Sequence, residues 1–506
     1  MDLSRENNIE RLRQAALLLD AENKRLLQQL TKVMRELSAA KGEKAAALQL
    51  KLEELERQLA LRNKALFGTS SEKRPGAEKP PAEKKAKTGH GPKEQRALPI
   101  LEQLHTLDAS DMQCTSCGGE LKEWAGQFEE SEEIDVLART FVLTKHKRQK
   151  YRCGCSGCIE TALPPQKLFP GARYSIDVAV DIALAKYLDH LPLERQVRML
   201  KRDGLDMDSQ TLWDYLERLA RILQPAHDAL HVHILKQGVV GADETRWLLL
   251  GAKPGETSKW QAWAVCAPSA VCYRILDSRS AEAARIVLKD YVGTVVADGY
   301  GAYSSLRSKG GAFRLAHCWA HVRRKYVECE ASFPQAGEVL QLIGELYALE
   351  KGDQAGPLGV AERARIRSTK SRELVSRIHD WALAQRALPQ SGLGRAIAYM
   401  GGLWLGLVLF LEDPAIPLDN NATERALRGP VIGRKNHYGS RSKRGTEVAA
   451  LFYSLLESAK LNGLDERAYL RRAVRDALAG AESLLPHELA SSPTSDESSS
   501  PSVAIA

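Results

Sequence analysis

Two aspartates follow apolar, strand-like stretches of the sequence. Asp243 ends the run "GVVGAD", and Asp298 ends "GTVVAD". Either residue alone is explained as a turn residue. Two carboxylates at the ends of neighbouring strands, however, repel each other unless a cation lies between them, and oxygen ligands suit Mg2+ or Mn2+. Two such ions about 3.5–4 Å apart assist the in-line displacement of a phosphoryl group. The pair therefore indicates phosphoryl-transfer chemistry.

A third carboxylate is needed to complete such a site, and Glu424 in "DNNATERALRG" is the candidate. The same letters fit a helix capping box, in which Asn421 caps the helix and Glu424 reaches back to the Asn421 amide. The two interpretations are compatible if Asn421 caps the helix while Glu424 points toward the sheet. Arg428 follows one helical turn later, where it could meet a phosphate.

Basic residues surround this third carboxylate. The stretch from Arg425 to Arg444 contains no acid, and a second basic stretch runs from Lys73 to Arg96. Together they account for more than the whole net charge of +8. A localised basic run is typical either of a solvated loop or of a surface that binds a polyanion, with nucleic acid first. The predicted DNA-binding residues are Arg425, Arg428, Arg434, Lys435, Arg441, Lys443 and Arg444.

Paired cysteines predict a second metal site. Cys114 and Cys117 form one Cys-x-x-Cys pair, and Cys155 and Cys158 form another. Four thiolates in two such pairs match tetrahedral Zn2+. Cys153 lies close enough in sequence to replace Cys155 as a ligand.

Other cysteines and histidines are assigned no metal. Cys266 and Cys272 lie in strand-like segments and are expected in the core. His317, Cys318 and His321 could be imagined as ligands, but without a partner pair we expect them to pack or to form hydrogen bonds.

From residue 237 onward the pattern predicts strand, strand, strand, helix, strand, helical turn, strand and helix. This is the order of an RNase H-like sheet, in which the strands bearing Asp243 and Asp298 can be neighbours. Residues 326–411 show no strand signal, so we expect an all-helical insertion before Glu424. The predicted fold class is multidomain α+β.

The remaining segments have simpler patterns. Apolar residues recur every seven positions from Leu12, with Asn23 in the seam, which predicts a coiled coil and self-association as a homo-oligomer. Residues 175–224 are helical and compatible with a helix-turn-helix. The expected organisation is coiled coil 1–69, basic linker 70–98, zinc-binding segment 99–170, helical DNA-binding region 171–236, catalytic core 237–325, helical insertion 326–411, second part of the core 412–460, C-terminal helical segment 461–490 and disordered tail 491–506.

Neither a signal peptide nor a membrane span is expected. The N-terminus leads straight into a charged helix. The most apolar stretch, 396–411, is short for a membrane span and is expected to form a buried helix. Nine clustered cysteines do not suggest a secreted disulfide framework. We therefore expect a cytoplasmic protein.

Six ordered motifs resemble those of the transposases of insertion-sequence family 66, namely "GADETRW", "ADGYGAY", "HCWAHVRRKY", "NNATERALR", "GRKN" and "AKLNGLDERAYL". The resemblance covers nearly the whole chain. It implies a bacterial DDE transposase with Asp243, Asp298 and Glu424 as its acids, a leucine zipper, a zinc-binding segment and small accessory proteins as partners. The chain departs from the family after Tyr151, where three cysteines replace a simpler pair.

The working hypothesis is a Mg2+-dependent enzyme that cuts DNA at terminal inverted repeats and joins the freed 3′ ends to target DNA. The zinc segment, the helical region and the basic loops would hold the DNA ends, largely through phosphates. Two alternatives remain open. One is a nuclease or resolvase that cuts without joining, and the other is a non-catalytic DNA-binding regulator.

Overall fold

The computed structural model describes Leu104, Thr106, Met112 and residues 116–122, 140–152, 158–253, 257–351, 359–482 and 484–491. Contacts divide the chain into two units, Ser70–Thr140 on the one hand and Met1–Thr69 with Phe141–Ala506 on the other. Each unit is described by itself. The predicted coiled coil, the predicted basic linker and all of the predicted tail except Ser491 lie outside the described residues.

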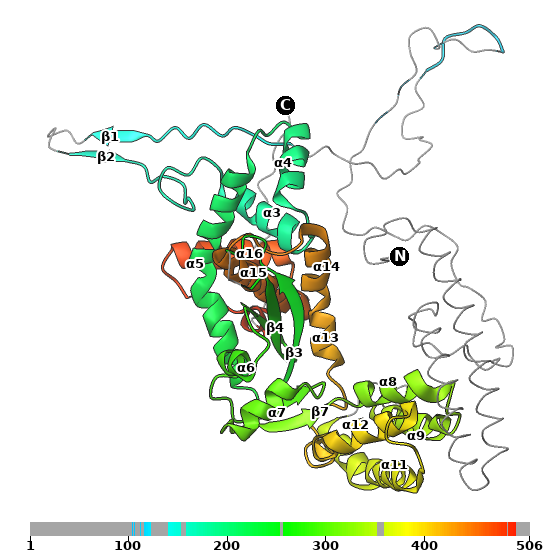
Figure 1. Ribbon diagram of the computed structural model, residues 1–506. Helices are drawn as coiled ribbons and strands as arrows, with labels where there is room; N and C mark the ends of the chain where they lie inside the picture. Colours follow the sequence, from blue (N-terminus) through cyan, green and yellow to red (C-terminus); the bar gives the residue numbers. More distant parts are fainter. Residues whose placement is uncertain are drawn as a thin grey trace, which may run out of the picture. The chain divides into compact units, whose positions relative to one another are not determined.

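A five-stranded sheet forms the centre of the larger unit (Figure 1). Its strands are β3 (Val239–Leu248), β4 (Lys259–Ala267), β5 (Ala270–Leu276), β6 (Thr294–Ala297) and β7 (Arg314–His317), arranged in the order β5-β4-β3-β6-β7. The first three are antiparallel neighbours, whereas β6 and β7 run parallel to β3. Parallel neighbours need crossover connections, and these contain α6 (Ala281–Leu288) and α7 (Gly301–Ser308). The predicted order of elements is confirmed.

Helices before the sheet share its core. They are α3 (Ile176–Tyr187), α4 (Leu193–Arg202) and α5 (Ser209–Leu235). Asp208 caps α5, because its carboxylate accepts a hydrogen bond from the Thr211 N–H at 2.6 Å. Along its length α5 buries Leu212, Leu219 and Leu230 in the same apolar cluster as Val240 of β3. The helical region is therefore packed onto the sheet domain.

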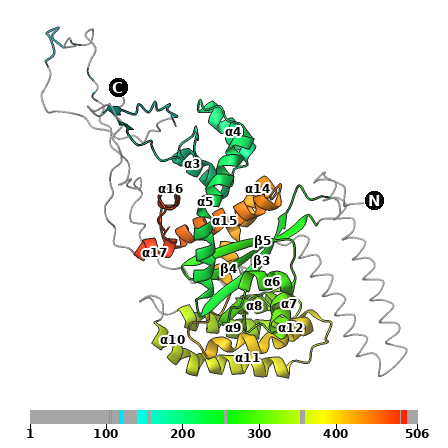
Figure 2. The same ribbon diagram turned by 90° about the vertical axis from the view of Figure 1, so that its left-hand side faces the viewer.

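Helix α15 (Lys443–Leu461) covers the outer edge of the sheet (Figure 2). Three polar residues four positions apart lie on one face of it, and each bonds the main chain of β5 or its preceding turn. The Ser454 hydroxyl accepts from Tyr273 N at 2.8 Å, and Asn462 Nδ2 donates to Ser269 O at 2.7 Å. Between them, Ser458 accepts from Val271 N and donates to Val271 O. One helical turn is close in length to two strand residues. The three side chains therefore match the spacing of the main-chain groups along the edge strand β5, which would otherwise be unpaired.

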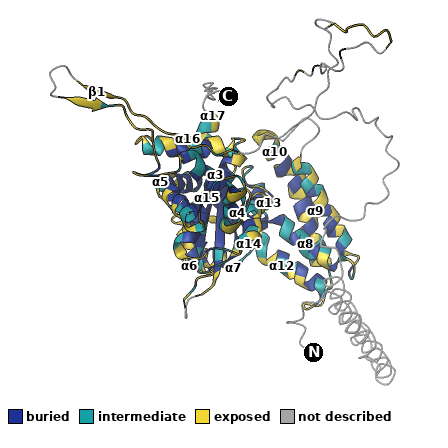
Figure 3. Ribbon diagram, turned by 90° about the horizontal axis from the view of Figure 1, so that it is seen from above, coloured by how far each residue is buried: buried dark blue, intermediate teal, exposed yellow. Residues whose placement is uncertain are grey.

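The chain after β7 turns helical. Its elements are α8 (Trp319–Glu330), α9 (Ala336–Lys351), α10 (Val360–Ile366), the π-helix η4 (Arg367–Ser371), α11 (Arg372–Ala384), α12 (Gly392–Leu407) and the 3-10 helix η5 (Leu409–Leu411). Their buried faces (Figure 3) form a second apolar cluster, which also takes in Val296 of β6 and Ala316 of β7. Among the described residues of 326–411 there is no strand, as predicted.

Arg367 holds the end of this helical part in place. Its guanidinium is 2% exposed and forms two bonds of 2.7 Å to the Glu350 carboxylate. It also donates to the carbonyls of Phe410, Asp413 and Ile416. A buried charge is tolerated only when it is paired and fully hydrogen-bonded. Arg367 meets that condition by binding the segment that leads back to the sheet.

The chain then returns through α13 (Asn421–Ala426) and α14 (Arg428–His437), and α15, α16 (Glu466–Leu478) and α17 (Pro486–Ser491) follow. Ahead of α3, β1 (Lys150–Arg152) and β2 (Ile159–Thr161) form an antiparallel hairpin.

One described stretch, Gly392–Leu411, is long and apolar enough to cross a membrane by length and composition alone. It contains α12, which buries Leu393, Ala396 and Met400 in the helical cluster. The sequence predicted a buried helix, but only one face of α12 is buried, and Leu405 on it is exposed.

Replacing Ser458 by alanine should destabilise the sheet domain. The hydroxyl is fully buried and serves both main-chain groups of Val271, so its loss leaves two buried polar groups unpaired, at a cost of roughly 2–4 kcal/mol. Chemical denaturation would measure the free energy of unfolding. The exposed Ser368→Ala change is the control and should alter it by less than about 0.5 kcal/mol. Equal stability of the two variants would contradict this account of the sheet edge.

Candidate functional site

Strand register brings the two aspartates side by side. Val239 pairs with Thr294 and Gly241 with Val296 in the parallel β3–β6 ladder. When this register is continued by two residues along both strands, Asp243 lies opposite Asp298. The expectation that the strand stops at Asp243 is wrong, because β3 continues to Leu248 through its pairing with β4. Of β3 and β6, β6 is the one that ends at this level, at Ala297.

The Asp298 turn is fixed on both sides. Its carboxylate accepts from Tyr300 N at 2.8 Å, and its carbonyl accepts from the Tyr399 hydroxyl of α12 at 2.6 Å. Gly299 follows with φ +95°, and a Cβ there would lie 2.8 Å from Leu403 Cδ1. A side chain would therefore be strained at this position. The helical part of the chain thus buttresses the turn that presents Asp298.

Asn420 fastens α13 to β3. Its Nδ2 donates to Ala242 O at 2.9 Å, and its Oδ1 accepts from the Thr423 hydroxyl at 2.6 Å. Asn420 and Thr423 lie so close to Gly241 that a Cβ there would be 2.1 Å from Thr423 Oγ1 and 2.5 Å from Asn420 Oδ1. Glycine at position 241 is therefore what allows α13 to lie against the strand that carries Asp243.

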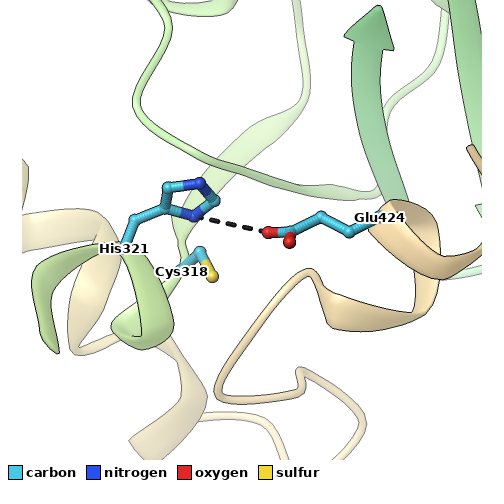
Figure 4. A group of neighbouring side chains, drawn as sticks. All are labelled: Cys318, His321 and Glu424. Carbon is cyan, nitrogen blue, oxygen red and sulfur yellow. Dashed lines mark ion pairs between the residues drawn. The ribbon is translucent and has the colours of Figure 1, made fainter. Parts of the chain in front are cut away.

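The capping-box interpretation of Asn421 and Glu424 is wrong. Asn420 occupies the N-cap position, and Asn421 bonds to Asp419 through both its main-chain N–H and its Nδ2. The Glu424 carboxylate does not fold back onto that amide. Its Oε1 lies 3.6 Å from His321 Nδ1 of α8 (Figure 4). The break between α13 and α14 also places Arg428 at the start of a second helix instead of one turn along the same one.

Burial and neighbouring carboxylates act together on Asp243. Burial, together with the charges of Glu244, Asp298 and Glu424, raises the pKa of its carboxyl group to about 7, against the hydrogen bond from Glu244 N–H, which lowers it. The charges of the other two predicted acids therefore act on Asp243. A divalent cation beside them would relieve this repulsion.

Glu244 is a further carboxylate that the sequence analysis missed. It follows Asp243 on β3, and successive strand residues point to opposite faces. Arg279 pairs with it at 2.6 Å, and the Tyr303 hydroxyl donates to it at 2.9 Å. Its negative charge is thus matched locally, whereas Asp243 has no ion-pair partner among the described residues. The sequence signal for a second carboxylate was that Glu244 directly follows Asp243.

Cys318 and His321 lie beside Glu424. One ligating atom from each of the three residues lies within 4.8 Å of the other two (Figure 4). The expectation that these residues only pack or form hydrogen bonds overlooked this neighbour, because Glu424 is distant in sequence. Cys318 is also buried, which raises the pKa of its thiol to about 11. Cys266 and Cys272 are core residues, as predicted.

The basic residues divide into two groups. Arg425, Arg428, Lys435, Arg441 and Lys443 are exposed. Arg444 instead forms ion pairs with Glu217 at 3.1 Å and Glu447 at 2.7 Å, and Arg434 donates to the Arg246 carbonyl. These two are thus committed to contacts within the chain, which their sequence context does not reveal.

The predicted zinc ligands are only partly described. Cys117 and Cys158 are exposed and form no disulfide. Cys114, Cys153 and Cys155 lie outside the described residues. The choice between Cys153 and Cys155 stays a prediction.

Comparison with known families gives the wider context. The model of the "Transposase IS66 family" matches residues 171–448, more than half of the chain. The chain belongs to the IS66 transposase family. A second model, the "zinc-finger binding domain of transposase IS66", matches residues 111–156. That range contains Cys114, Cys117, Cys153 and Cys155 and ends before Cys158.

Relatives of this IS66 transposase occur in Sinorhizobium fredii (strain NBRC 101917 / NGR234). "Uncharacterized protein y4jD" is 32% identical over 405 residues, which cover 75% of this chain and 78% of the relative. "Uncharacterized protein y4hP" is 28% identical over 384 residues, which cover 71% and 69%. Two solved structures of Mos1, the strand transfer complex and the paired-end complex with left transposon end, are each 13% identical over 49% of this chain and 81% or 82% of theirs. Their TM-score of 0.13 is too low to carry a structural argument.

Asp243→Asn should make the stability of the chain less sensitive to pH. The raised pKa of Asp243 means that the folded chain holds a proton that the unfolded chain has released between about pH 4 and pH 7. Wild-type stability should therefore fall relative to Asp243→Asn as pH rises through this window. Thermal unfolding at pH 5.5 and pH 8 measures the difference, with the exposed Asp277→Asn as control.

Added Mg2+ should restore wild-type stability at pH 8 and have less effect on Asp243→Asn, since a ligand that binds the folded state stabilises it. If the difference in stability between wild type and Asp243→Asn depended on neither pH nor Mg2+, it would contradict a strained carboxylate at this position.

Proposed function

We propose that this chain binds the terminal inverted repeats of its insertion sequence, cleaves DNA there and joins the 3′ ends to target DNA by phosphoryl transfer. The observation that carries the proposal is the convergence of Asp243, Asp298 and Glu424, which the strand register and the raised pKa of Asp243 both support. Membership of the IS66 transposase family agrees with it. The strand order β5-β4-β3-β6-β7 supports an RNase H-like catalytic domain.

The three acids suit Mg2+ or Mn2+. All are oxygen donors, which hard divalent cations prefer, and Asp243 carries a charge that its surroundings disfavour. Glu424 Oε1 is buried without a hydrogen-bond partner among the described residues. In this family the ions would activate the attacking oxygen and stabilise the leaving oxygen of the phosphodiester.

The residues around the acids have separate tasks in the proposed reaction. Asn420 and Thr423 fix the helix that carries Glu424, and Tyr399 fixes the Asp298 turn. Preorganised groups contribute most to catalysis because they need not move during the reaction. Arg425 and Arg428, exposed next to Glu424, would hold DNA phosphates close to the acids.

Asp243→Asn, Asp298→Asn and Glu424→Gln should each reduce strand transfer by about 100-fold or more, since each removes a proposed metal ligand. The assay uses purified chain, Mg2+ and a DNA fragment from the flanks of its own gene, with joined strands resolved on a gel. End binding should persist, because it depends on basic residues. Glu282→Gln, an exposed acid on α6, is the matched control.

The same assay separates the alternatives. Cut products without joined strands would indicate a nuclease or resolvase. If the three acid variants and the Mg2+-free protein gave the same result as wild type with Mg2+, the chain would be a non-catalytic DNA-binding regulator. Near-wild-type joining by Glu424→Gln would remove Glu424 from the proposed site.

Arg428→Ala and Lys435→Ala should each weaken DNA binding and reduce its salt dependence. Each lost phosphate contact lowers the slope of log K against log salt by about one. Arg444→Ala is the matched control, because Arg444 is already paired with Glu217 and Glu447. It should lower the stability of the chain and leave the slope unchanged. Equal slopes for all three variants would contradict this division of the basic residues.

A further inference from the structure

We propose that Cys318, His321 and Glu424 form a binding site for a transition-metal ion of the zinc class, separate from the cysteine site near the N-terminus. The ligating atoms of the three residues lie within 4.8 Å of one another. The site shares Glu424 with the proposed Mg2+ site. Metal binding to it can be measured without DNA, so this inference does not depend on the proposed reaction.

The three ligands stand on fixed elements. Cys318 is the N-cap residue of α8, and His321 follows three positions later, so both lie on one face of the helix start. Glu424 comes from α13, which Asn420 and Thr423 hold against β3. A metal site needs ligands that are held by their supports before the ion arrives.

Burial disfavours the Cys318 thiolate and raises the pKa of the thiol to about 11, but hydrogen-bond donors around the sulfur offset part of this effect. Asn420 N donates to Cys318 Sγ at 3.3 Å, and the amides of His321 and Ala320 also favour its charged form. The N-terminal end of α8 adds a positive dipole. The metal-free thiol is nevertheless protonated, so binding forms a sulfur–metal bond and releases one proton to solvent, without any redox change.

Two buried polar atoms in the cluster have no hydrogen-bond partner among the described residues. They are His321 Nδ1 and Glu424 Oε1. They face each other at 3.6 Å, which is too long for a hydrogen bond. Buried polar groups are normally satisfied, and an ion between these two atoms and the sulfur would satisfy both.

The donor set selects the metal. One sulfur, one imidazole nitrogen and one carboxylate oxygen suit Zn2+ or Co2+, whereas Mg2+ prefers oxygen ligands alone. Zinc bonds of about 2.0–2.3 Å require the ligands to close in by about an ångström, which side-chain rotation can supply. Glu424 would be held through Oε1, leaving its other oxygen for the proposed Mg2+ site.

The test is the zinc content of the purified full-length chain after dialysis against a weak chelator. Wild type should retain two equivalents, one at each site. Cys318→Ser and His321→Ala should each lose one equivalent and keep the other, and Cys117→Ser should show the converse loss. If Cys318→Ser fails to fold, His321→Gln serves instead. Cys329→Ser, which changes another buried cysteine of α8, is the matched control and should retain both.

Cobalt substitution identifies the ligands. In a Cys117→Ser background, Co2+ should give a thiolate-to-cobalt absorption band that Cys318→Ser abolishes. Asp243→Asn should keep the band even where strand transfer is lost, which separates this site from the proposed reaction. The proposal is overturned if wild type holds a single equivalent that Cys117→Ser removes. It is equally overturned if Cys318→Ser and His321→Ala retain the zinc content of wild type.

Discussion

The position of Glu424 relative to the two aspartates depends on the buried side chain of Asn420. It bonds Ala242 of β3 on one side and Thr423 of α13 on the other, while its main-chain N–H bonds Cys318. These bonds join three segments that are far apart in sequence. Gly241 is part of the same constraint, because any side chain there would push α13 away from the strand. The distance between Glu424 and the aspartates thus depends on the hydrogen bonds of Asn420 and on the absence of a side chain at Gly241 as much as on apolar packing.

Charge is distributed unevenly around this connection. Asp243 and Glu244 are adjacent on β3, yet alternation along the strand gives them different surroundings. Glu244 is neutralised by Arg279 and bonded by Tyr303, whereas Asp243 meets two further carboxylates. The arrangement leaves uncompensated negative charge on one side of the strand only. That side is the one that faces α13 with its exposed Arg425, which suits binding of cations and phosphates together.

Local patterns predicted the order of elements from β3 to α8, because apolar runs and amphipathic periods are local properties. The equal offset of β3 and β6 also agrees with the predicted pairing of the aspartates. The patterns failed where tertiary contacts decide. β3 runs past Asp243 because β4 pairs with it, and Asn420 replaces Asn421 as the N-cap residue because its side chain reaches Ala242. Nothing local to "HCWAH" shows that Glu424 lies beside it, nor does the basic run show that Glu217 neutralises Arg444.

The helical part of the chain shares an apolar cluster with Val296 of β6 and Ala316 of β7, and it also makes specific polar contacts with the site. Tyr399 of α12 bonds the Asp298 carbonyl, and Cys318 at the start of α8 receives the Asn420 N–H. Arg367 in turn fixes the segment that leads back toward Asn420. Asp298 is therefore held from the helical part, whereas Glu424 is held by β3 through Asn420 as well as by the returning segment. Only Asp243 lies on a strand paired on both sides. A change in the packing of these helices would therefore act first on the Asp298 turn, whereas Asp243 and Glu424 stay joined through Asn420 and β3.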